Sequence, residues 1–537
     1  MIRSAALLVV GMLVFYGVLA LPNHPSAMGW GALRLFPLEL PIILAALLLA
    51  GRTRWVQALT ITACLIVVVL KLADYAMYEA YGRAVNLATD WVLLGAGLNL
   101  LSSTVGLVQA ILAILGVIVG LIAIGALLAS AAWSWARLQV PGWARAVPIL
   151  AVVGFAGLSI AEIGYLKRFW TVDTNPPGAA FSSRLGYEHV VRFSKTRREI
   201  ASFQALAAKD PYLTADSLFD LIGKRDVLFI FLESYGRSSF DNPLYAATHV
   251  PTLRVAEERL GKSGFALRSG WLTSPIAGGQ SWLAHGTLFS GLRTADQGRY
   301  MAMLLSDRKS LFHLAAEAGF HTGAVMPAIT MAWPEGERMG FETILAARDL
   351  DYAGHPFNWV TMPDQYTLNA YAKRLPDDDR PDFLQITLIS SHAPWVPIPE
   401  IVPWADIGDG TIFDQWALSG DTPAVVWRDR DRVRDQYRKS IDYVLGTVMS
   451  FAEQQGSDGP LMIILGDHQP AGFVAQIDSR DVPVHVIGPP ELVAHLDDWN
   501  WVPGLRPNDD TPVWPMEEFR DRFIKAFTST APSERPS

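Results

Sequence analysis

The stretch DVLFIFLES, residues 226–234, decides the fold class of the larger part of this chain. Its apolar residues run on without alternation, which is typical of a strand that is buried on both faces. Three later runs share this character: FLQITLI (383–389), LMIIL (461–465) and VPVHVI (482–487). Helical patterns over 308–318 and 434–455 intervene. We therefore expect an α/β sandwich with a mainly parallel central sheet.

Polar side chains follow three of these runs, at the points where the predicted strands end. Glu233 follows the first, His392 ends the sequence ISSH after the second, and Asp467-His468 follow the third. Ligands bind beyond the carboxyl ends of strands in such sheets, and carboxylates with a neutral imidazole suit a divalent cation. Taken alone, Glu233 would be interpreted as a cap of the following helix, and Asp467-His468 would be interpreted as a turn. Together they predict a metal site.

A fourth segment, TSPIAGGQSWLAHGTLFSG (273–291), supplies a candidate nucleophile. Its glycine pair permits an unusual backbone, and Ser281 then falls at the start of a short helix that ends at Gly291. A serine oxygen there can ligate the metal, while the N–H groups of a helix N-terminus face an anionic phosphate. His285 lies one turn later on the same face. The alternative is that Ser281 only caps the helix.

The N-terminal third of the chain is apolar. The 537 residues are only 18% charged, whereas soluble globular chains carry about 25%. The N-terminal third contains five apolar stretches, and most of them approach the ~20 residues that a helix needs to cross a bilayer. We therefore expect five transmembrane helices. The stretches are 5–21, 33–50, 55–70, 105–133 and 147–160.

Arginines in the loops predict the orientation, since short cytoplasmic loops are enriched in Lys and Arg. They fall before the first span, between spans two and three and between spans four and five: Arg3, Arg52, Arg54, Arg137 and Arg145. The N-terminus is then cytoplasmic, and the chain after about Tyr165 lies outside, in the periplasm of a double-membrane bacterium. Glu39, within the second span, is either functional or snorkels to the interface.

We divide the chain into a transmembrane domain (1–166), a juxtamembrane linker and amphipathic helix (167–222), a catalytic domain (223–528) and a tail (529–537). The linker is basic, so it is either a solvated face or a contact with anionic lipid headgroups. Residues 201–537 carry 29 Lys and Arg against 44 Asp and Glu, which disfavours nucleic acid as a partner. A single cysteine, Cys64, excludes an intramolecular disulfide framework.

The order of Glu233, Ser281 and Asp467-His468 after a membrane anchor resembles the alkaline phosphatase/sulfatase superfamily. It is most similar to the membrane-anchored group of lipoteichoic acid synthases, phosphoglycerol transferases and phosphoethanolamine transferases. The resemblance implies one divalent cation (Mn, Zn or Mg), a covalent phospho-Ser281 intermediate, and roles for further residues. Those roles are metal ligation by Glu233, Ser281, Asp467 and His468, phosphate contact by His392, and a headgroup pocket with Trp333.

Departures from the family pattern bear on the substrate. Ser281 stands where the transferases usually have Thr. Glu335 occupies the position of an Arg in the synthases, which Arg338 would replace from one turn away. The sequence lacks the Pro and Arg that formylglycine maturation needs, so a sulfatase ranks lower. Phosphoethanolamine transferases typically carry periplasmic disulfides, so the single membrane cysteine favours the phosphoglycerol branch.

The sequence thus predicts an inner-membrane transferase. It would move phosphoglycerol from an anionic phospholipid, phosphatidylglycerol, to a glycan or glycolipid acceptor. Covalent catalysis splits one displacement into two. Proton transfer would fall to His285, His392 or His485, although His485, inside an apolar strand, also reads as a core residue. Alternatives are a phosphoethanolamine transferase, a tethered phosphodiesterase or sulfatase-like hydrolase, and a lipid-binding regulator without activity.

Overall fold

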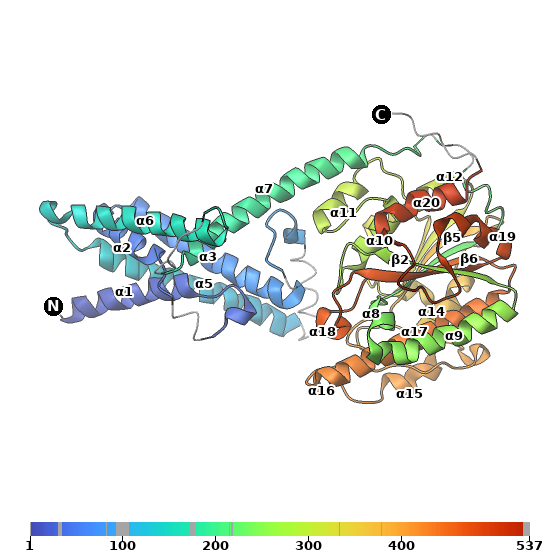
Figure 1. Ribbon diagram of the computed structural model, residues 1–537. Coiled ribbons are helices and arrows are strands. Elements are labelled where there is room, and N and C mark those ends of the chain that lie inside the picture. The colour runs from blue at the N-terminus through green and yellow to red at the C-terminus, as the bar shows by residue number, and fades with distance from the viewer. Residues whose placement is uncertain are drawn as a thin grey trace. The chain divides into compact units, whose positions relative to one another are not determined.

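A computed structural model describes residues 2–29, 35–81, 83–92, 107–170, 178–213, 215, 218–331, 333–376 and 378–529. The chain forms two compact units, Met1–Glu199 and Ile200–Ser537 (Figure 1). Unit 1 is helical, and unit 2 contains the sheet.

All five apolar stretches of unit 1 contain helix. The helices are α1 (Ile2–Ala20), α2 (Glu39–Ala50), α3 (Arg54–Tyr81), α5 (Leu107–Ala136) and α6 (Ala146–Leu166), and α7 (Phe181–Ala207) continues into unit 2. Three segments are long and apolar enough to cross a membrane: Arg54–Tyr78, Val108–Ala136 and Gly142–Leu166. The apolar parts of α1 and α2 are shorter. Three membrane-spanning candidates are therefore evident, and the expected five spans stay a prediction.

Glu39 has a structural role that is not evident from the sequence. It is the first residue of α2 and is buried, with 6% of its surface exposed. Its Oε1 accepts hydrogen bonds from the backbone N–H groups of Ser182 and Ser183, both at 2.8 Å. These N–H groups lie in the first turn of α7, where they have no partner within the helix. Glu39 therefore caps α7 and joins it to α2.

Unit 2 is built on a nine-stranded mixed sheet in the order β4-β3-β5-β1-β6-β7-β2-β8, with β9 paired to β2. The strands are β1 (Val227–Leu232), β2 (Ala266–Thr273), β3 (His321–Met326), β4 (Thr343–Ala346), β5 (Asp382–Leu388), β6 (Leu461–Gly466), β7 (Asp481–Gly488), β8 (Val502–Pro503) and β9 (Val513–Pro515). The central strands β3, β5, β1 and β6 are parallel, whereas β7 is antiparallel to β6. The expected mainly parallel α/β sheet is confirmed.

Helices cover both faces of this sheet, as Figure 1 shows. Those of unit 2 are α8 (Ser238–Asp241), α9 (Pro243–Lys262), α10 (Ser281–Ser290), α11 (Gln297–Leu304), α12 (Leu311–Glu317), α13 (Pro334–Glu337), α14 (Asp364–Ala370), α15 (Asp414–Ala417), α16 (Pro423–Val426), α17 (Arg430–Gln455), α18 (Gly472–Ala475), α19 (Pro490–Val493) and α20 (Phe519–Ala526). One core cluster joins the sheet to α10, α12 and α20, and a second joins it to α9, α14 and α17. Because both faces are covered, β1 is buried along its whole length, as its unbroken apolar run predicts.

Unit 2 begins at Ile200, ahead of β1, and the start of a catalytic domain at residue 223 stays a prediction. Phe203, Tyr212 and Phe219 belong to the core cluster on the α10 side. Asp210 accepts two hydrogen bonds from one guanidinium nitrogen of Arg520, at 2.7 and 2.9 Å, and both side chains are fully buried. The segment before β1 is therefore part of the catalytic fold.

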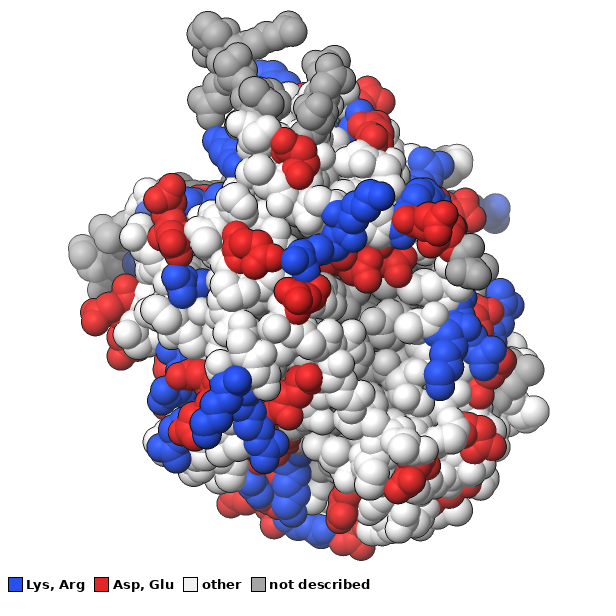
Figure 2. Space-filling view, turned by 90° about the vertical axis from the view of Figure 1, so that its right-hand side faces the viewer, with Lys and Arg blue, Asp and Glu red and all other residues white. Residues whose placement is uncertain are grey.

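The acidic excess of unit 2 is not gathered into one patch on the face that Figure 2 presents. Lys and Arg side chains there are interspersed with Asp and Glu, and uncharged surface lies between the groups. No broad basic surface is visible among the described residues of that face.

Candidate active site

Two neighbouring parallel strands place the acidic residues of the site. Glu233 follows β1 directly, and Asp467 and His468 follow β6. Leu232 and Gly466 are partners in the β1–β6 register, so the two strands end at the same level. Residues that are far apart in sequence thereby meet at one edge of the sheet.

Glu233, Asp467 and His468 form a compact buried cluster. One potential ligand atom from each lies within 4.8 Å of the others. The Nε2 atom of His468 is 3.2 Å from a Glu233 carboxylate oxygen and 3.8 Å from Asp467 Oδ2. At most 5% of any of these residues is exposed.

Backbone contacts hold the two strand ends in place. The Ser391 hydroxyl donates to the Glu233 carbonyl at 2.7 Å, and the Ser274 hydroxyl donates to the Asp467 carbonyl at the same distance. Ser234 has a left-handed backbone (φ +60°), and its N–H donates to Asp467 Oδ1 at 2.9 Å. These contacts tie the segment after β5 and the loop before α10 to the cluster.

Ser281 is the first residue of α10, as predicted. The three residues before Ser281 all take positive φ values, +75° at Gly278, +134° at Gly279 and +67° at Gln280, so the chain turns sharply into the helix. The Ser281 hydroxyl donates to Glu233 Oε2 at 2.8 Å and lies 3.2 Å from His468 Nε2. The side chain of Ser281 is partly exposed. A hydroxyl that solvent can reach therefore rests against the acidic cluster.

The charges of the cluster depend on one another. Burial and the neighbouring Glu233 carboxylate raise the pKa of Asp467 to about 7. Burial opposes the charge of His468, but Asp467 and Glu233 together raise its pKa to about 9. Against burial, His468 holds the pKa of Glu233 well below its usual range. The carboxylates of Glu233 and Asp467 therefore strongly stabilise a positive charge between them.

The cluster fits a divalent cation. No described residue forms a hydrogen bond with the buried Oδ2 of Asp467, which leaves a carboxylate oxygen available for a metal. The Nδ1 atom of His468 lies 2.8 Å from the Gln469 carbonyl. That contact holds the proton on Nδ1 when the ring is neutral and turns the lone pair of Nε2 toward the carboxylates, as in known metal-ligating histidines.

His392 follows β5 and is close enough to Glu233 for the two side chains to interact electrostatically. It is partly exposed. The ring of Trp359 stacks on the His392 ring with centroids 3.8 Å apart and an angle of 16°. The neighbouring Asn358 donates to the Val396 carbonyl at 2.7 Å, so two contacts hold the His392 loop. Sequence reasoning missed Trp359, which stands in a segment without a strand or helix pattern.

His285 lies below the site on α10. Its Nδ1 is 3.1 Å from Gln385 Nε2, and its ring lies 4.0 Å from that of Phe231. Burial lowers the pKa of His285 to about 3, so the ring is neutral. Nε2 is buried and contacts no described hydrogen-bonding group. No described hydrogen bond joins His285 to Ser281, so its role in proton transfer stays a proposal.

His485 does not lie at the site. It is in β7, which is antiparallel to β6 and pairs it with Ile464 in the middle of the sheet. Its ring nitrogens lie 2.8 Å from the Ser269 hydroxyl and 3.1 Å from the Tyr235 hydroxyl, and the residue is fully buried. Burial lowers its pKa to about 3. This placement favours the alternative reading of His485, a packed core histidine, over a role in substrate binding or proton transfer.

Trp333 and Arg338 flank the short helix α13. Trp333 packs against the core on the α10 side, with its ring 5.9 Å from Phe341. Arg338 is exposed. Among the described residues, no hydrogen bond, ion pair or ring contact links either side chain to the Ser281 cluster. Their predicted role in headgroup binding therefore stays a prediction.

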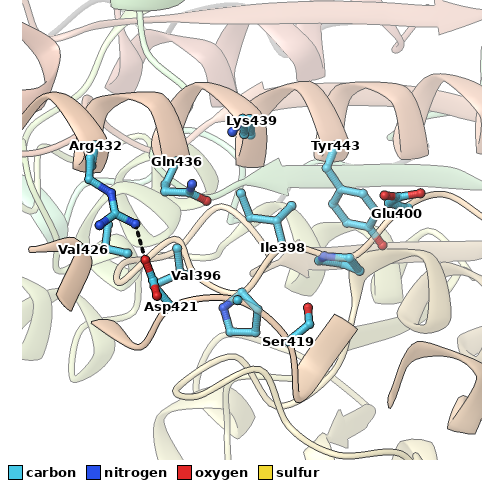
Figure 3. A pocket seen from close by; sticks show the side chains of 13 residues that line it. Val396, Ile398, Glu400, Ser419, Asp421, Val426, Arg432, Gln436, Lys439 and Tyr443 are labelled. Atoms are coloured by element: carbon cyan, nitrogen blue, oxygen red, sulfur yellow. Dashed lines mark hydrogen bonds and ion pairs between the residues drawn. The ribbon is translucent and has the colours of Figure 1, made fainter. Parts of the chain in front are cut away.

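A cavity of about 360 Å³ lies between α17 and the loop that follows His392 (Figure 3). Val396 and Ile398 from the loop and Gln436 and Tyr443 from α17 line it. Its charged groups include both signs, and Arg432 and Asp421 are paired at 2.6 Å. This balance of charge with apolar walls suits an uncharged polar ligand better than an anion. The sequence offered no signal for this cavity, because its walls come from distant segments.

Comparisons with known proteins bear on the family and the fold. Residues 225–483 match the sulfatase family model. The phosphoethanolamine transferase EptA of Neisseria meningitidis, an integral membrane protein, has the same overall fold, with 13% identity and a TM-score of 0.52 over 98% of this chain and 96% of its own. No curated protein matched the chain in sequence.

Two further solved structures resemble part of the chain, with lower TM-scores. The lipoteichoic acid synthase LtaP of Listeria monocytogenes matches with 12% identity and a TM-score of 0.38, over 62% of this chain and 79% of its own. The phosphoglycerol transferase GacH of Streptococcus pyogenes matches with 13% identity and a TM-score of 0.37, over 63% and 83%.

Proposed function

Because residues 225–483 match the sulfatase family model, we propose that the chain is a metal-dependent phosphoryl-group transferase of the bacterial inner membrane, in the alkaline phosphatase superfamily. It moves phosphoglycerol from phosphatidylglycerol to a glycan or glycolipid acceptor on the periplasmic side. The reaction passes through a covalent ester on Ser281.

One observation carries this proposal. A partly exposed serine hydroxyl lies 2.8 Å from a buried carboxylate oxygen and 3.2 Å from a buried imidazole nitrogen, at the N-terminus of a ten-residue helix. The hydroxyl is a nucleophile with a proton acceptor in place. The helix N-terminus and the cation site favour the negative charge of a phosphate.

Glu233, Ser281, Asp467 and His468 would hold the divalent cation. When bound, it would lower the pKa of the serine hydroxyl and offset the charge on the phosphate oxygens. Mn, Zn and Mg all accept such a set of ligands.

The protein groups account for the bonds and protons. Ser281 Oγ attacks the donor phosphorus as its proton passes to Glu233 Oε2. The bond from phosphorus to the diacylglycerol oxygen breaks, and that oxygen takes a proton from His392. In the second step an acceptor hydroxyl loses its proton to His392 and attacks the same phosphorus, the bond to Ser281 breaks, and Glu233 returns the proton to the serine. Each step exchanges one P–O bond for another.

The apolar helices of unit 1 favour a lipid as the donor, because a membrane protein and a phospholipid lie in the same bilayer. The absence of cysteine outside α3 supports phosphoglycerol, as the family resemblance implies, over phosphoethanolamine. The 360 Å³ cavity beside the His392 loop, with its paired charges, supports an uncharged glycan as acceptor.

The decisive experiment is mass spectrometry of Ser281. The full chain, purified in detergent with Mn²⁺, is incubated with phosphatidylglycerol or with phosphatidylethanolamine. We expect a glycerophosphate adduct on Ser281 and release of diacylglycerol. An ethanolamine-phosphate adduct selects the alternative donor, and adduct turnover by water without acceptor selects the hydrolase.

Two substitutions make the result specific. Ser281→Ala removes the hydroxyl and is expected to abolish both the adduct and diacylglycerol release. Ser281→Thr retains a hydroxyl and is expected to retain both. EDTA is expected to reduce the adduct to background. Unchanged turnover in Ser281→Ala would show that another group is the nucleophile.

A further inference from the structure

A cavity of about 520 Å³ lies at one end of unit 1. Its walls are the C-terminal ends of α2 and α5, which pack against each other, and the segment that leads to α6. Residues 48–52, residues 136–140 and Arg145 line it. The cavity belongs entirely to unit 1 and shares no residue with the Ser281 site.

The charge of this cavity is positive and uncompensated. Three arginines line it, Arg52, Arg137 and Arg145, and the chain has no Asp or Glu over residues 40–73 or 91–161. The guanidinium of Arg137 lies 3.4 Å from the centre of the Trp133 ring. Among the described residues, no ion pair or hydrogen bond engages any of the three guanidinium groups. Three cations around one hollow create a strong attraction for an anion.

Aromatic side chains at the same end indicate what surrounds the cavity. Trp55 is 85% exposed and Trp143 is 88% exposed, and each lies close in sequence to a lining arginine. Tryptophans that are this exposed on apolar helices are typical of the membrane–water interface. Leu49 of the cavity wall is also exposed, at 40%. The cavity therefore opens where lipid headgroups lie.

We propose that this cavity binds the phosphate of an anionic phospholipid headgroup, with Arg52, Arg137 and Arg145 as the recognising cations. Guanidinium groups match phosphate oxygens in paired hydrogen bonds, and basic pockets between membrane helices suit such headgroups. The acyl chains would lie along the exposed apolar surfaces of α2 and α5. With the predicted orientation, the lipid belongs to the cytoplasmic leaflet. Inorganic phosphate shares the recognised chemistry, so the test includes it.

The test is native mass spectrometry of the full chain carrying Ser281→Ala, so that lipid is not consumed. Three probes are compared: dioleoylphosphatidylglycerol, dioleoylphosphatidylethanolamine and inorganic phosphate. We expect retention of phosphatidylglycerol in clear preference to phosphatidylethanolamine. In the Arg52→Gln/Arg145→Gln variant, we expect that retention to fall by about tenfold or more, since two charged contacts are lost.

Arg54 provides the matched control. It lies two residues from Arg52, at the same end of the unit, but does not line the cavity. Arg54→Gln is expected to retain phosphatidylglycerol like the parent chain. Arg52→Lys/Arg145→Lys keeps the loop charge and is expected to give intermediate retention.

Three results would overturn the proposal. The first is equal retention of phosphatidylglycerol and phosphatidylethanolamine. The second is a loss of phosphatidylglycerol retention in Arg54→Gln that equals the loss in Arg52→Gln/Arg145→Gln. The third is binding of inorganic phosphate that depends on the same arginines but is not displaced by phosphatidylglycerol.

Discussion

Asp364 shows how a buried carboxyl outside the metal cluster shapes the site. It is the first residue of α14 and is fully buried. Its Oδ1 accepts hydrogen bonds from the N–H groups of Ile389 and Ser390, at 2.7 and 3.0 Å. Those residues lead from β5 to His392. Asp364 therefore anchors the start of the loop that carries His392.

The pH dependence of stability tests this anchor. Burial raises the pKa of Asp364 to about 7, above the ~3.9 of an unfolded Asp. The folded state then holds a proton that the unfolded state has lost, so this contribution to stability is complete below about pH 4 and disappears as the pH rises to about 7. Asn accepts the same hydrogen bonds without titrating. We expect the Tm of Asp364→Asn, relative to the parent chain, to rise between pH 4 and pH 7 and then to level off; a pH-independent difference would contradict the assignment.

Trp359 is expected to position His392 through the stack between their rings. Trp359→Ala removes the aromatic surface and should lower kcat by about ten- to a hundredfold, the scale of a small misplacement of a reacting group. Trp359→Phe retains a stacking ring and should restore most of the activity. Diacylglycerol release measured over a range of donor concentrations separates kcat from KM. Equal losses in both variants would exclude stacking as the cause.

At the scale of elements, the turn into α10 sets the position of Ser281, the proposed nucleophile. Gly279 has φ +134°, a conformation that side chains with a Cβ rarely adopt, although a Cβ there would meet no atom within 4 Å. Substitution thus tests the backbone conformation without a steric clash.

Gly279→Ala is expected to displace Ser281 and to lower transfer at least tenfold, with a cost of about 1–3 kcal/mol in stability. Gly472→Ala is the matched control, because Gly472 also has open space around it but no positive φ. It begins the short helix α18 and should leave both activity and Tm unchanged. Diacylglycerol release and thermal unfolding in detergent measure the two effects; full activity in Gly279→Ala would show that α10 tolerates another turn.

At the scale of the whole molecule, the extent of unit 2 leads to a prediction about truncation. A chain of residues 200–529 retains the buried pair of Asp210 and Arg520 and the aromatic residues that pack before β1. A chain of residues 226–529 loses them and leaves Arg520 buried without Asp210, which costs about 3–5 kcal/mol.

We expect the longer chain to unfold cooperatively and to cleave a soluble phosphodiester, and the shorter chain to be insoluble or to unfold at a much lower temperature. Without unit 1, the longer chain should act poorly on phosphatidylglycerol in vesicles. Asp210→Asn in the longer chain should reproduce part of the destabilisation. Equal Tm values for the two chains would show that the segment before β1 is dispensable.

The layered α/β fold and the meeting of Glu233 with Asp467 and His468 could both be predicted from the sequence alone. Unbroken apolar runs report burial on both faces, and polar residues after parallel strands must meet at one edge. Glu233, Ser281, Asp467 and His468 could be found for that reason. The positions of several other side chains depend on how the chain packs in three dimensions. His485 stands inside an apolar run, where the sequence left both a proton-transfer role and a core role open, and its pairing with Ile464 of β6 places it within the sheet.

Contacts between distant segments explain the other differences. Trp359 stacks on His392, Asp210 pairs with Arg520, and Glu39 caps α7, yet none of these partners is near the other in sequence. The cavity arginines likewise act together only because α2 and α5 end side by side. Periodicity describes how a segment is buried, whereas the partner of a side chain is set by how segments pack.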